Sequence, residues 1–127
     1  MRQNYSSGTA WENMIGYSRC VRVGNFIKVS GTTAVNDQGQ IMGDSVYEQC
    51  HLIYKKIEHA LTMAGSSMDH VVMTRIYIRD IQKWEEAGKA HSEVFDEIRP
   101  AATMVEVSGL IHPDMLVEIE VEAFMHY

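Results

Sequence analysis

Residues 71–80 read Val-Val-Met-Thr-Arg-Ile-Tyr-Ile-Arg-Asp, a stretch in which β-branched and aromatic side chains predominate. These side chains alternate between two faces with the period of two that is typical of a strand. One face carries Val72, Thr74, Ile76 and Ile78, and the other carries Met73, Arg75, Tyr77 and Arg79. The segments before and after this strand have a helical period instead. The stretch therefore predicts a fold in which helices pack on a sheet.

The helix before this strand is predicted to begin after Asp44 or Ser45, either of which can cap it, and to end at Gly65. Its apolar side chains recur at spacings of three and four and form one stripe, made of Val46, Cys50, Ile53, Ile57, Ala60, Leu61 and Ala64. The helix after the strand is predicted over about Lys83 to Glu97, because Arg99-Pro100 has to end it.

The remaining strands are predicted at both ends of the chain. Cys20 to Val23 and Phe26 to Ser30 flank Gly24-Asn25, a dipeptide suited to the tight turn of a hairpin. The last two strands are predicted over Thr103 to Ser108 and Leu116 to Phe124. Met1 to Trp11 is only loosely patterned, and the loop Thr32 to Gly43 has no regular period. The element order is β-β-α-β-α-β-β, which predicts a two-layer α+β domain with both helices on one face of the sheet.

The alternation of each strand divides its side chains between a core and an open face. The predicted core consists of Val21, Val23, Ile27, Val29, Ile76, Ile78, Val105, Val107, Val117, Ile119 and Val121. The predicted open face carries Arg22, Lys28, Ser30, Arg75, Tyr77, Arg79, Glu106, Glu118, Glu120 and Glu122. Such a face is either solvated, with weak cross-strand ion pairs, or buried against other copies of the chain in a symmetric oligomer.

Composition restricts the classes of protein to consider. The chain has 127 residues, of which 46% are hydrophobic, so residues 1–127 are expected to form one domain with a substantial core. The net charge of −6 disfavours nucleic acid as a partner. No run approaches the ~20 apolar residues that a membrane-spanning helix needs. Cys20 and Cys50 follow no secretory leader, so free thiols and a cytoplasmic location are expected.

Few residue patterns indicate a specific chemistry. The six histidines lack metal-ligand spacing, so no metal is expected. Glycine-rich phosphate loops and a Gly-x-Ser-x-Gly elbow are absent, so no nucleotide cofactor is indicated. The three carboxylates of Glu118, Glu120 and Glu122 share one face at ~7 Å spacing. If one of them lies partly desolvated at a subunit boundary, its pKa rises toward the range of a general base; alternatively all three are solvated or paired with arginine.

Four stretches resemble the RidA family of imine deaminases, also called YjgF. They are Ile15-Gly16-Tyr17, the segment Phe26 to Gly31 (FIKVSG), the segment Arg99 to Val107 (RPAATMVEV) and Val117-Glu118-Ile119-Glu120. The resemblance implies a chorismate-mutase-like fold in homotrimers, with the sheets in a central barrel and small-molecule clefts between subunits. It also implies the metal-free hydrolysis of reactive 2-imino or enamine acids to 2-oxo acids and ammonia.

The resemblance assigns roles to single positions. It implies that Glu118 holds the attacking water and that Tyr17, Ser30, Gly31 and Met104 contact the substrate. Ala102 stands where the imine-deaminating members have the arginine that grips the substrate carboxylate, and a methyl group offers no such fork. Gly88 and His91 also differ from the deaminases, which implies a reshaped pocket.

Two hypotheses of function follow from this departure. In the first, the trimer is an enzyme that deaminates imines or enamines other than the standard 2-imino acids, with Arg19 or Arg99 as conceivable replacements for the missing arginine. In the second, it is a non-catalytic trimer that binds a metabolite. An endoribonuclease comes third, because an acidic chain offers little attraction for RNA.

Overall fold

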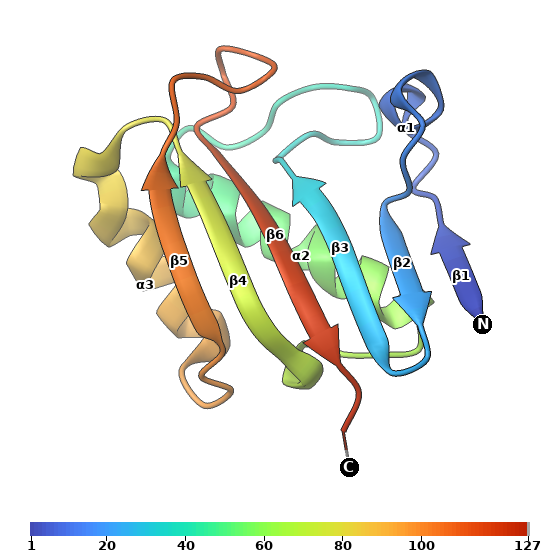
Figure 1. Cartoon of the computed structure of the whole chain (residues 1–127). Coiled ribbons are helices and arrows are strands. Elements are labelled where there is room, and N and C mark those ends of the chain that lie inside the picture. The colour runs from blue at the N-terminus through green and yellow to red at the C-terminus, as the bar shows by residue number, and fades with distance from the viewer. Residues whose placement is uncertain (127) are drawn as a thin grey trace.

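In the computed structural model, which describes residues 1–126, six strands form one sheet in the order β1-β2-β3-β6-β4-β5 (Figure 1). The strands are β1 (Arg2–Tyr5), β2 (Cys20–Val23), β3 (Phe26–Thr32), β4 (Val71–Ile78), β5 (Ala101–Glu106) and β6 (Val117–Phe124). The last strand lies between β3 and β4 and is antiparallel to both. Only the pair β4 and β5 is parallel, since the helix between them returns the chain to the same end of the sheet.

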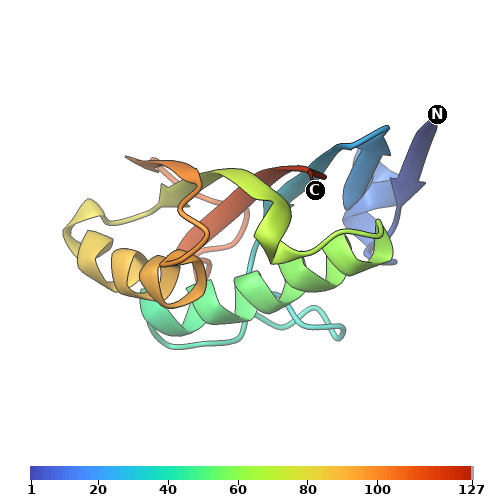
Figure 2. The same cartoon turned by 90° about the horizontal axis from the view of Figure 1, so that it is seen from below.

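The helices are α1 (Ala10–Ile15), α2 (Val46–Met63) and α3 (Trp84–Phe95), with short 3₁₀ turns at Met68–His70 and Ile81–Lys83. Figure 2 shows α2 and α3 side by side beneath one face of the sheet, so the predicted two-layer α+β architecture is confirmed. Ser45 rather than Asp44 caps α2, because its hydroxyl accepts a hydrogen bond from the N–H of Glu48. None of the helices within residues 1–126 has the length and apolar character needed to cross a bilayer.

The N-terminal segment is more ordered than predicted. Residues treated as loosely patterned form β1, which pairs with β2, and the short helix α1. A four-residue edge strand reading Arg-Gln-Asn-Tyr has no apolar alternation, and a six-residue helix is too short to show a helical period. These elements owe their structure to pairing and packing with distant residues rather than to local pattern.

The three central strands have the predicted faces. Seven predicted core residues are at most 2% exposed, namely Ile27, Val29, Ile76, Ile78, Val117, Ile119 and Val121. They pack against the apolar stripe of α2 and against Phe95 of α3. Full burial of side chains of this size stabilises the fold by roughly 1.5–3 kcal/mol each.

The predicted faces of β2 are wrong. Val21 and Val23 were expected in the core, but Val23 is 52% exposed, and Cys20 is the fully buried residue of this strand. Arg22 was expected on the open face, yet it reaches the helix side and donates a hydrogen bond to the carbonyl of Ala64 at the end of α2 (2.7 Å). A shift of one residue in the alternation exchanges the two faces of a strand. On β2 this shift lets the Arg22 guanidinium cap the C-terminal end of α2.

The predicted position and faces of β5 are also wrong. The strand begins two residues earlier than expected, and its parallel register pairs Met104 with Ile76 and Val105 with Tyr77. Val105 therefore lies on the open face and is 43% exposed, while Glu106 turns away and accepts a hydrogen bond from the N–H of Ile81 (3.0 Å). Val107 and Arg79 lie beyond the ends of their strands.

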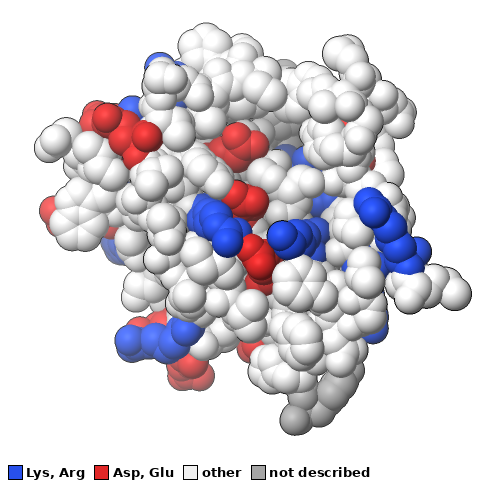
Figure 3. Space-filling view, in the orientation of Figure 1, with Lys and Arg blue, Asp and Glu red and all other residues white. Residues whose placement is uncertain are grey.

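The open face carries charges of both signs across its middle, and further charged side chains lie toward its margins among uncharged ones (Figure 3). Within it, the hydroxyl of Tyr77 donates to Glu120 and the guanidinium of Arg75 pairs with Glu122. Exposed apolar side chains flank these pairs, namely Val23, Phe26, Val105 and Phe124. The polar lattice predicted from the sequence is therefore present on the central strands, with an apolar rim that the sequence did not indicate.

Candidate functional site

A small pocket lies at the end of the sheet where β3 ends, β6 begins and α1 is located (Figure 1). Its cavity volume is about 50 Å³, enough for one water molecule at ~30 Å³ of liquid volume. The pocket is lined by Ser7, Thr9, Trp11, Tyr17, Arg19, Gly31, Thr33, Val35, Lys56, Ile111, Met115 and Glu118. Three of the residues predicted to form the site, Tyr17, Gly31 and Glu118, thus meet here.

Glu118 differs from the other two glutamates of β6. Glu120 and Glu122 are bound by Tyr77 and Arg75, whereas the Glu118 carboxylate forms no hydrogen bond or ion pair with any residue in 1–126. Burial raises the pKa of Glu118. The negative charge of Glu120 also raises this pKa, whereas the positive charge of Arg19 lowers it in part. A partly buried carboxyl with a raised pKa and unused oxygens can accept a proton from a water molecule.

Gly31 is fitted closely to Glu118. A Cβ atom at position 31 would lie 2.5 Å from Oε2 of Glu118 and 3.0 Å from its Cδ, so any larger residue would push the carboxylate away. The register between β3 and β6 shifts between Val29 and Thr32, which frees the backbone around Gly31 from regular pairing. The neighbouring Ser30 does not line the pocket; its hydroxyl donates to the carbonyl of Ser18 (2.6 Å).

Arg19 holds one wall of the Glu118 pocket together. It is only 7% exposed, and its Nη1 donates to the carbonyl of Gly31 (2.9 Å) and to the hydroxyl of Thr32 (2.8 Å). Its Nη2 donates to the Tyr17 hydroxyl (3.3 Å), and its Nε lies 3.8 Å from Glu12. The Arg19 guanidinium thus donates its hydrogen bonds to groups of the protein. Because Gly31 and Tyr17 are among these acceptors, Arg19 positions both of them beside Glu118.

Glu12 supports Arg19 from a segment that the sequence did not mark as functional. Burial raises the pKa of Glu12, but hydrogen bonds from Ser7, Ser6 and Thr9 outweigh it, so the pKa is lowered overall. An ionised Glu12 therefore sits beside the buried guanidinium and balances its charge. Only its carboxylate within an otherwise uncharged stretch, Gln3 to Tyr17, distinguishes it in the sequence.

Lys56 is a second cation of this pocket that sequence reasoning missed. Its Nζ donates to the carbonyls of Thr33 (2.7 Å) and Val35 (3.0 Å), the backbone that leaves β3. Burial, with a smaller contribution from the positive charge of Arg19, lowers the pKa of Lys56 to about 8, and the negative charge of Asp37 partly opposes this shift. A signal was present, because Lys56 lies three residues after Ile53 and four before Ala60, at the border of the apolar stripe of α2.

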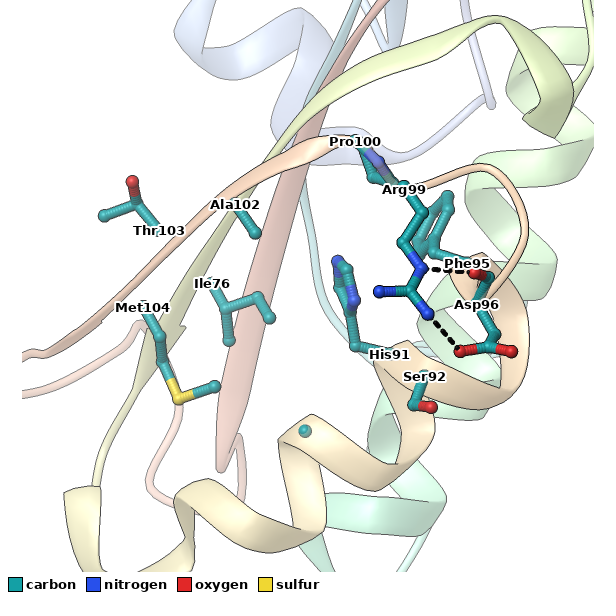
Figure 4. Close-up of a pocket in the computed structure, with 11 residues that line it drawn as sticks. Ile76, His91, Ser92, Phe95, Asp96, Arg99, Pro100, Ala102, Thr103 and Met104 are labelled. Atoms are coloured by element: carbon teal, nitrogen blue, oxygen red, sulfur yellow. Dashed lines mark hydrogen bonds and ion pairs between the residues drawn. The ribbon is translucent and has the colours of Figure 1, made fainter.

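Ala102 and Met104 lie in a different pocket, between the edge strand β5 and α3 (Figure 4). This pocket has a volume of about 350 Å³ and is lined by Ile76, Gly88, His91, Ser92, Phe95, Asp96, Arg99, Pro100, Ala102, Thr103 and Met104. His91 shares a hydrogen bond with the Thr74 hydroxyl (Nε2 to Oγ1, 2.9 Å), and burial lowers the pKa of His91. Strand β4 separates β5 from β6, so one chain by itself does not bring Ala102 and Glu118 into one pocket.

The two cysteines are buried and unpaired. Burial raises the pKa of Cys20 to about 11 and that of Cys50 to about 12, with a small opposing effect of Arg19 on Cys20. Thiols with such pKa values are weak nucleophiles at neutral pH. The predicted placement of Cys20 in a strand and of Cys50 on the buried face of a helix is confirmed.

The sheet with its inserted last strand and the small carboxylate pocket at the sheet end define a class of small two-layer α+β proteins. Residues 7–125 match the sequence family described as Endoribonuclease L-PSP. The chain belongs to this family, whose solved members are also grouped as the YjgF/YER057c/UK114 and Rid family. The resemblance seen in the sequence motifs is therefore confirmed.

Individual relatives are similar over most of their length. The crystal structure of Rv2704 from Mycobacterium tuberculosis has 43% sequence identity and a TM-score of 0.91, covering 98% of this chain and 100% of that one. An uncharacterized protein of Streptomyces coelicolor, SCO2049, is 33% identical over 93% of this chain and 88% of its own length. The 3-aminoacrylate deaminase RutC of Acinetobacter baylyi is 31% identical over 81% of this chain and 82% of its own length. These comparisons support a RidA-like small-molecule protein.

Proposed function

We propose that the chain is a metal-free deaminase that hydrolyses imine or enamine metabolites in clefts between the subunits of a homotrimer. The unpaired, partly buried carboxylate of Glu118 is the observation that carries this proposal. Family membership and the similarity to a 3-aminoacrylate deaminase, whose named substrate is an enamine, add support. Tyr17 and Gly31 complete the Glu118 side, Ser30 contributes through the backbone that Arg19 holds, and Met104 lies on the Ala102 side of the cleft.

The chemistry needs one base, which then acts as an acid. Glu118 accepts a proton from water while the water oxygen bonds to the imine carbon and the π electrons of the C=N bond move to nitrogen. The protonated Glu118 then gives this proton to the nitrogen. Glu118 next accepts the hydroxyl proton and passes it to the amino nitrogen, and the C–N bond breaks as the oxygen forms C=O, releasing NH3 and a carbonyl product. An enamine enters the same sequence after protonation at carbon gives the imine tautomer.

The proposed trimer joins the two pockets. The open face offers matched charges on β4 and β6 with exposed apolar side chains around them, the composition of a surface that packs against copies of itself. In such an assembly the pocket of Ala102 on the edge strand of one subunit adjoins the Glu118 pocket of a neighbour.

We further propose that residues 1–127 act as one domain in the cytoplasm, where the two buried thiols stay reduced.

Two matched glutamate variants test the proposal. Imines are generated from amino acids by an amino-acid oxidase, and both their disappearance and the release of ammonia are measured. Glu118→Gln is expected to lower kcat/KM by about 10²–10⁴-fold, since it removes the proton acceptor. Glu120→Gln, two residues along the same strand, serves as the control and is expected to leave kcat within a few-fold once trimer formation has been verified. Equal activity of Glu118→Gln and the wild type on every accepted substrate would exclude this mechanism.

A second candidate function is the binding of a metabolite without turnover, and the methyl group of Ala102 in place of a carboxylate-gripping arginine favours it. A ligand that raises Tm by mass action and is recovered chemically intact would support this alternative. Stoichiometric ammonia release would exclude it. The net charge of −6 argues against RNA as the substrate, despite the description of the family as endoribonucleases.

A further inference from the structure

Lys56 of α2 holds the backbone that leaves β3. Its Nζ donates hydrogen bonds to the carbonyls of Thr33 (2.7 Å) and Val35 (3.0 Å). Both of these residues, and Lys56 itself, line the Glu118 pocket. The pairing of β3 with β6 ends at Thr32, so an amine from a helix, rather than the next strand, satisfies these two carbonyls.

One bonding direction of this amine is unused. A lysine ammonium has three N–H donors, and no residue in 1–126 accepts a hydrogen bond from the third or forms an ion pair with it. When the third proton leaves, the neutral amine keeps both carbonyl contacts and has its lone pair in the vacated direction. The two contacts therefore hold the amine in place while its reactive electron pair points away from both carbonyls.

A cavity of about 260 Å³, which we call the α2 pocket, lies between α2 and the loop that follows β3. Val35 and Lys56 line both this cavity and the Glu118 pocket, so they separate the two. The Glu118 pocket of one chain has room for about one water molecule. A small organic molecule therefore meets Nζ from the α2 pocket. The lining of the α2 pocket includes four apolar side chains and two lysines, namely Ala34, Val35, Met42, Leu52, Lys55 and Lys56.

The surroundings of Lys56 activate its amine at neutral pH. Burial, with a smaller contribution from Arg19, lowers the pKa of Lys56 to about 8, and Asp37 partly opposes this shift. About one-tenth of such a lysine is neutral amine at pH 7, compared with roughly 0.04% of a lysine that has the ordinary pKa of about 10.4. Desolvation beside another cation is a general way of activating a lysine for covalent chemistry.

We propose that Lys56 is a covalent capture site for short aliphatic aldehydes, which enter the α2 pocket and form a Schiff base with Nζ. The apolar side chains of Met42 and Leu52 suit the alkyl part of such a molecule. The lone pair of Nζ bonds to the carbonyl carbon, and a proton passes from nitrogen to oxygen to give a carbinolamine. Loss of the hydroxyl group and one nitrogen proton as water then leaves the C=N bond. This capture does not use Glu118, so it goes beyond the proposed deaminase.

Capture changes the number of donors that hold the wall of the Glu118 pocket. The ammonium donates to Thr33 and Val35 at once, whereas a protonated Schiff base has one N–H and a neutral one has none. At least one of the two carbonyls thus loses its partner. The backbone of residues 33–35 is therefore expected to loosen, which couples the α2 pocket to the Glu118 pocket.

Reductive trapping on the intact protein locates the reactive amine. Butanal and sodium cyanoborohydride are added at pH 7, and peptide mass spectrometry follows the alkylation of each lysine over time. Lys56 is expected to react at least 10-fold faster than Lys55, which is its neighbour in the chain, lines the same cavity and is exposed. Peptide fragmentation distinguishes these two residues from each other and from the α-amino group of Met1.

Two arginine variants are matched controls. Lys56→Arg keeps a cation that can donate to both carbonyls but cannot form a Schiff base, so the fast reaction should be lost while Tm changes little. Lys55→Arg should retain the fast reaction. Equal rates at Lys55 and Lys56, or a fast reaction that survives in Lys56→Arg, would overturn the capture site.

Hydrogen exchange tests the coupling between the two cavities. The peptide that contains residues 33–35 is expected to exchange faster with butanal present than without it, and Lys56→Arg should show no such difference. Unchanged exchange despite trapping at Lys56 would overturn the coupling. These measurements need no imine substrate, so capture in a protein that releases no ammonia would refute only the deaminase, and ammonia release without capture would refute only this inference.

Discussion

Strand β6 carries three glutamates at the same spacing and on the same face, but their surroundings in the folded protein differ. Glu120 and Glu122 are bound by Tyr77 and Arg75 of the neighbouring β4. Glu118 lies where β3 bends away at Gly31, and it meets a small cavity instead of a partner. The pattern in the sequence is identical for all three, so contacts with the adjacent strand β4 distinguish Glu120 and Glu122, which are engaged, from Glu118, which remains available for chemistry.

The largest expected effect lies on the paired side of this comparison. Arg75→Met leaves Glu122 without its partner. If the open face is buried between subunits, as proposed, the unpaired charge is strongly destabilising and the trimer dissociates at protein concentrations at which the wild type stays assembled. On a solvated face the same change would have little effect. Lys55→Met, which removes a charge from the exposed side of α2, is the control.

Sedimentation velocity over a range of protein concentrations measures this difference. A variant that remains trimeric with a Tm close to that of Lys55→Met would show that the open face is solvated. Such a result would mean that the subunits do not pack through the open face, so the proposed cleft between the Ala102 and Glu118 pockets would lose its basis.

The next effect lies on the unpaired side. In Gly31→Ala the new methyl group would approach Oε2 of Glu118 to 2.5 Å, so the carboxylate has to move. We expect kcat to fall about 10²-fold from misplacement of the base and the free energy of unfolding to fall by about 1–3 kcal/mol. Gly109→Ala is the matched control, since no atom lies within 4 Å of a Cβ there. An active Gly31→Ala variant would mean that the Glu118 carboxylate need not occupy the observed position.

The sequence predicts the centre of the sheet better than its edges. On β3, β4 and β6 both faces are constrained, with Ile76 and Ile119 buried and charged residues opposite, so alternation identifies the phase. On β2 and β5 both faces carry valine or other apolar residues. Val23 and Val105 lie outward, where the proposed subunit contact would cover them, and Arg22 lies inward to cap α2. Hydrophobicity does not show which face of a strand points to the core where both faces are equally apolar.

The site divides along similar lines. Motifs close in the chain or shared with the family point to Tyr17, Gly31 and Glu118, and the structure brings these three together. They do not reveal the supporting ions, because Glu12 and Lys56 reach the pocket only through tertiary packing of α1 and α2. Nor does a sequence show that Arg99 takes a left-handed conformation, since this depends on how α3 ends against β5.

The smallest effect concerns the stability of the folded state around Glu118 itself. Burial raises the pKa of Glu118 above its ordinary value of 4.5, opposed in part by Arg19. The folded chain therefore binds this proton more tightly than the unfolded chain, and the free energy of unfolding falls as pH rises through the raised pKa. Above that pH the ionised carboxylate remains a penalty on folding, whereas a glutamine at this position carries none.

Glu118→Gln is thus expected to be inactive yet as stable as the wild type at pH 7, or more stable by about 0.5 kcal/mol. This difference should shrink as the pH is lowered toward 4, where the wild-type carboxyl gains its proton. Urea denaturation at pH 4, 5, 6 and 7 measures the difference, with Glu120→Gln as the control, whose amide oxygen can still accept the hydrogen bond from Tyr77 while its charge is removed. A Glu118→Gln variant that is less stable at pH 7 than at pH 4, relative to wild type, would show that the ionised carboxylate stabilises the fold. Glu118 would then belong with its two paired neighbours.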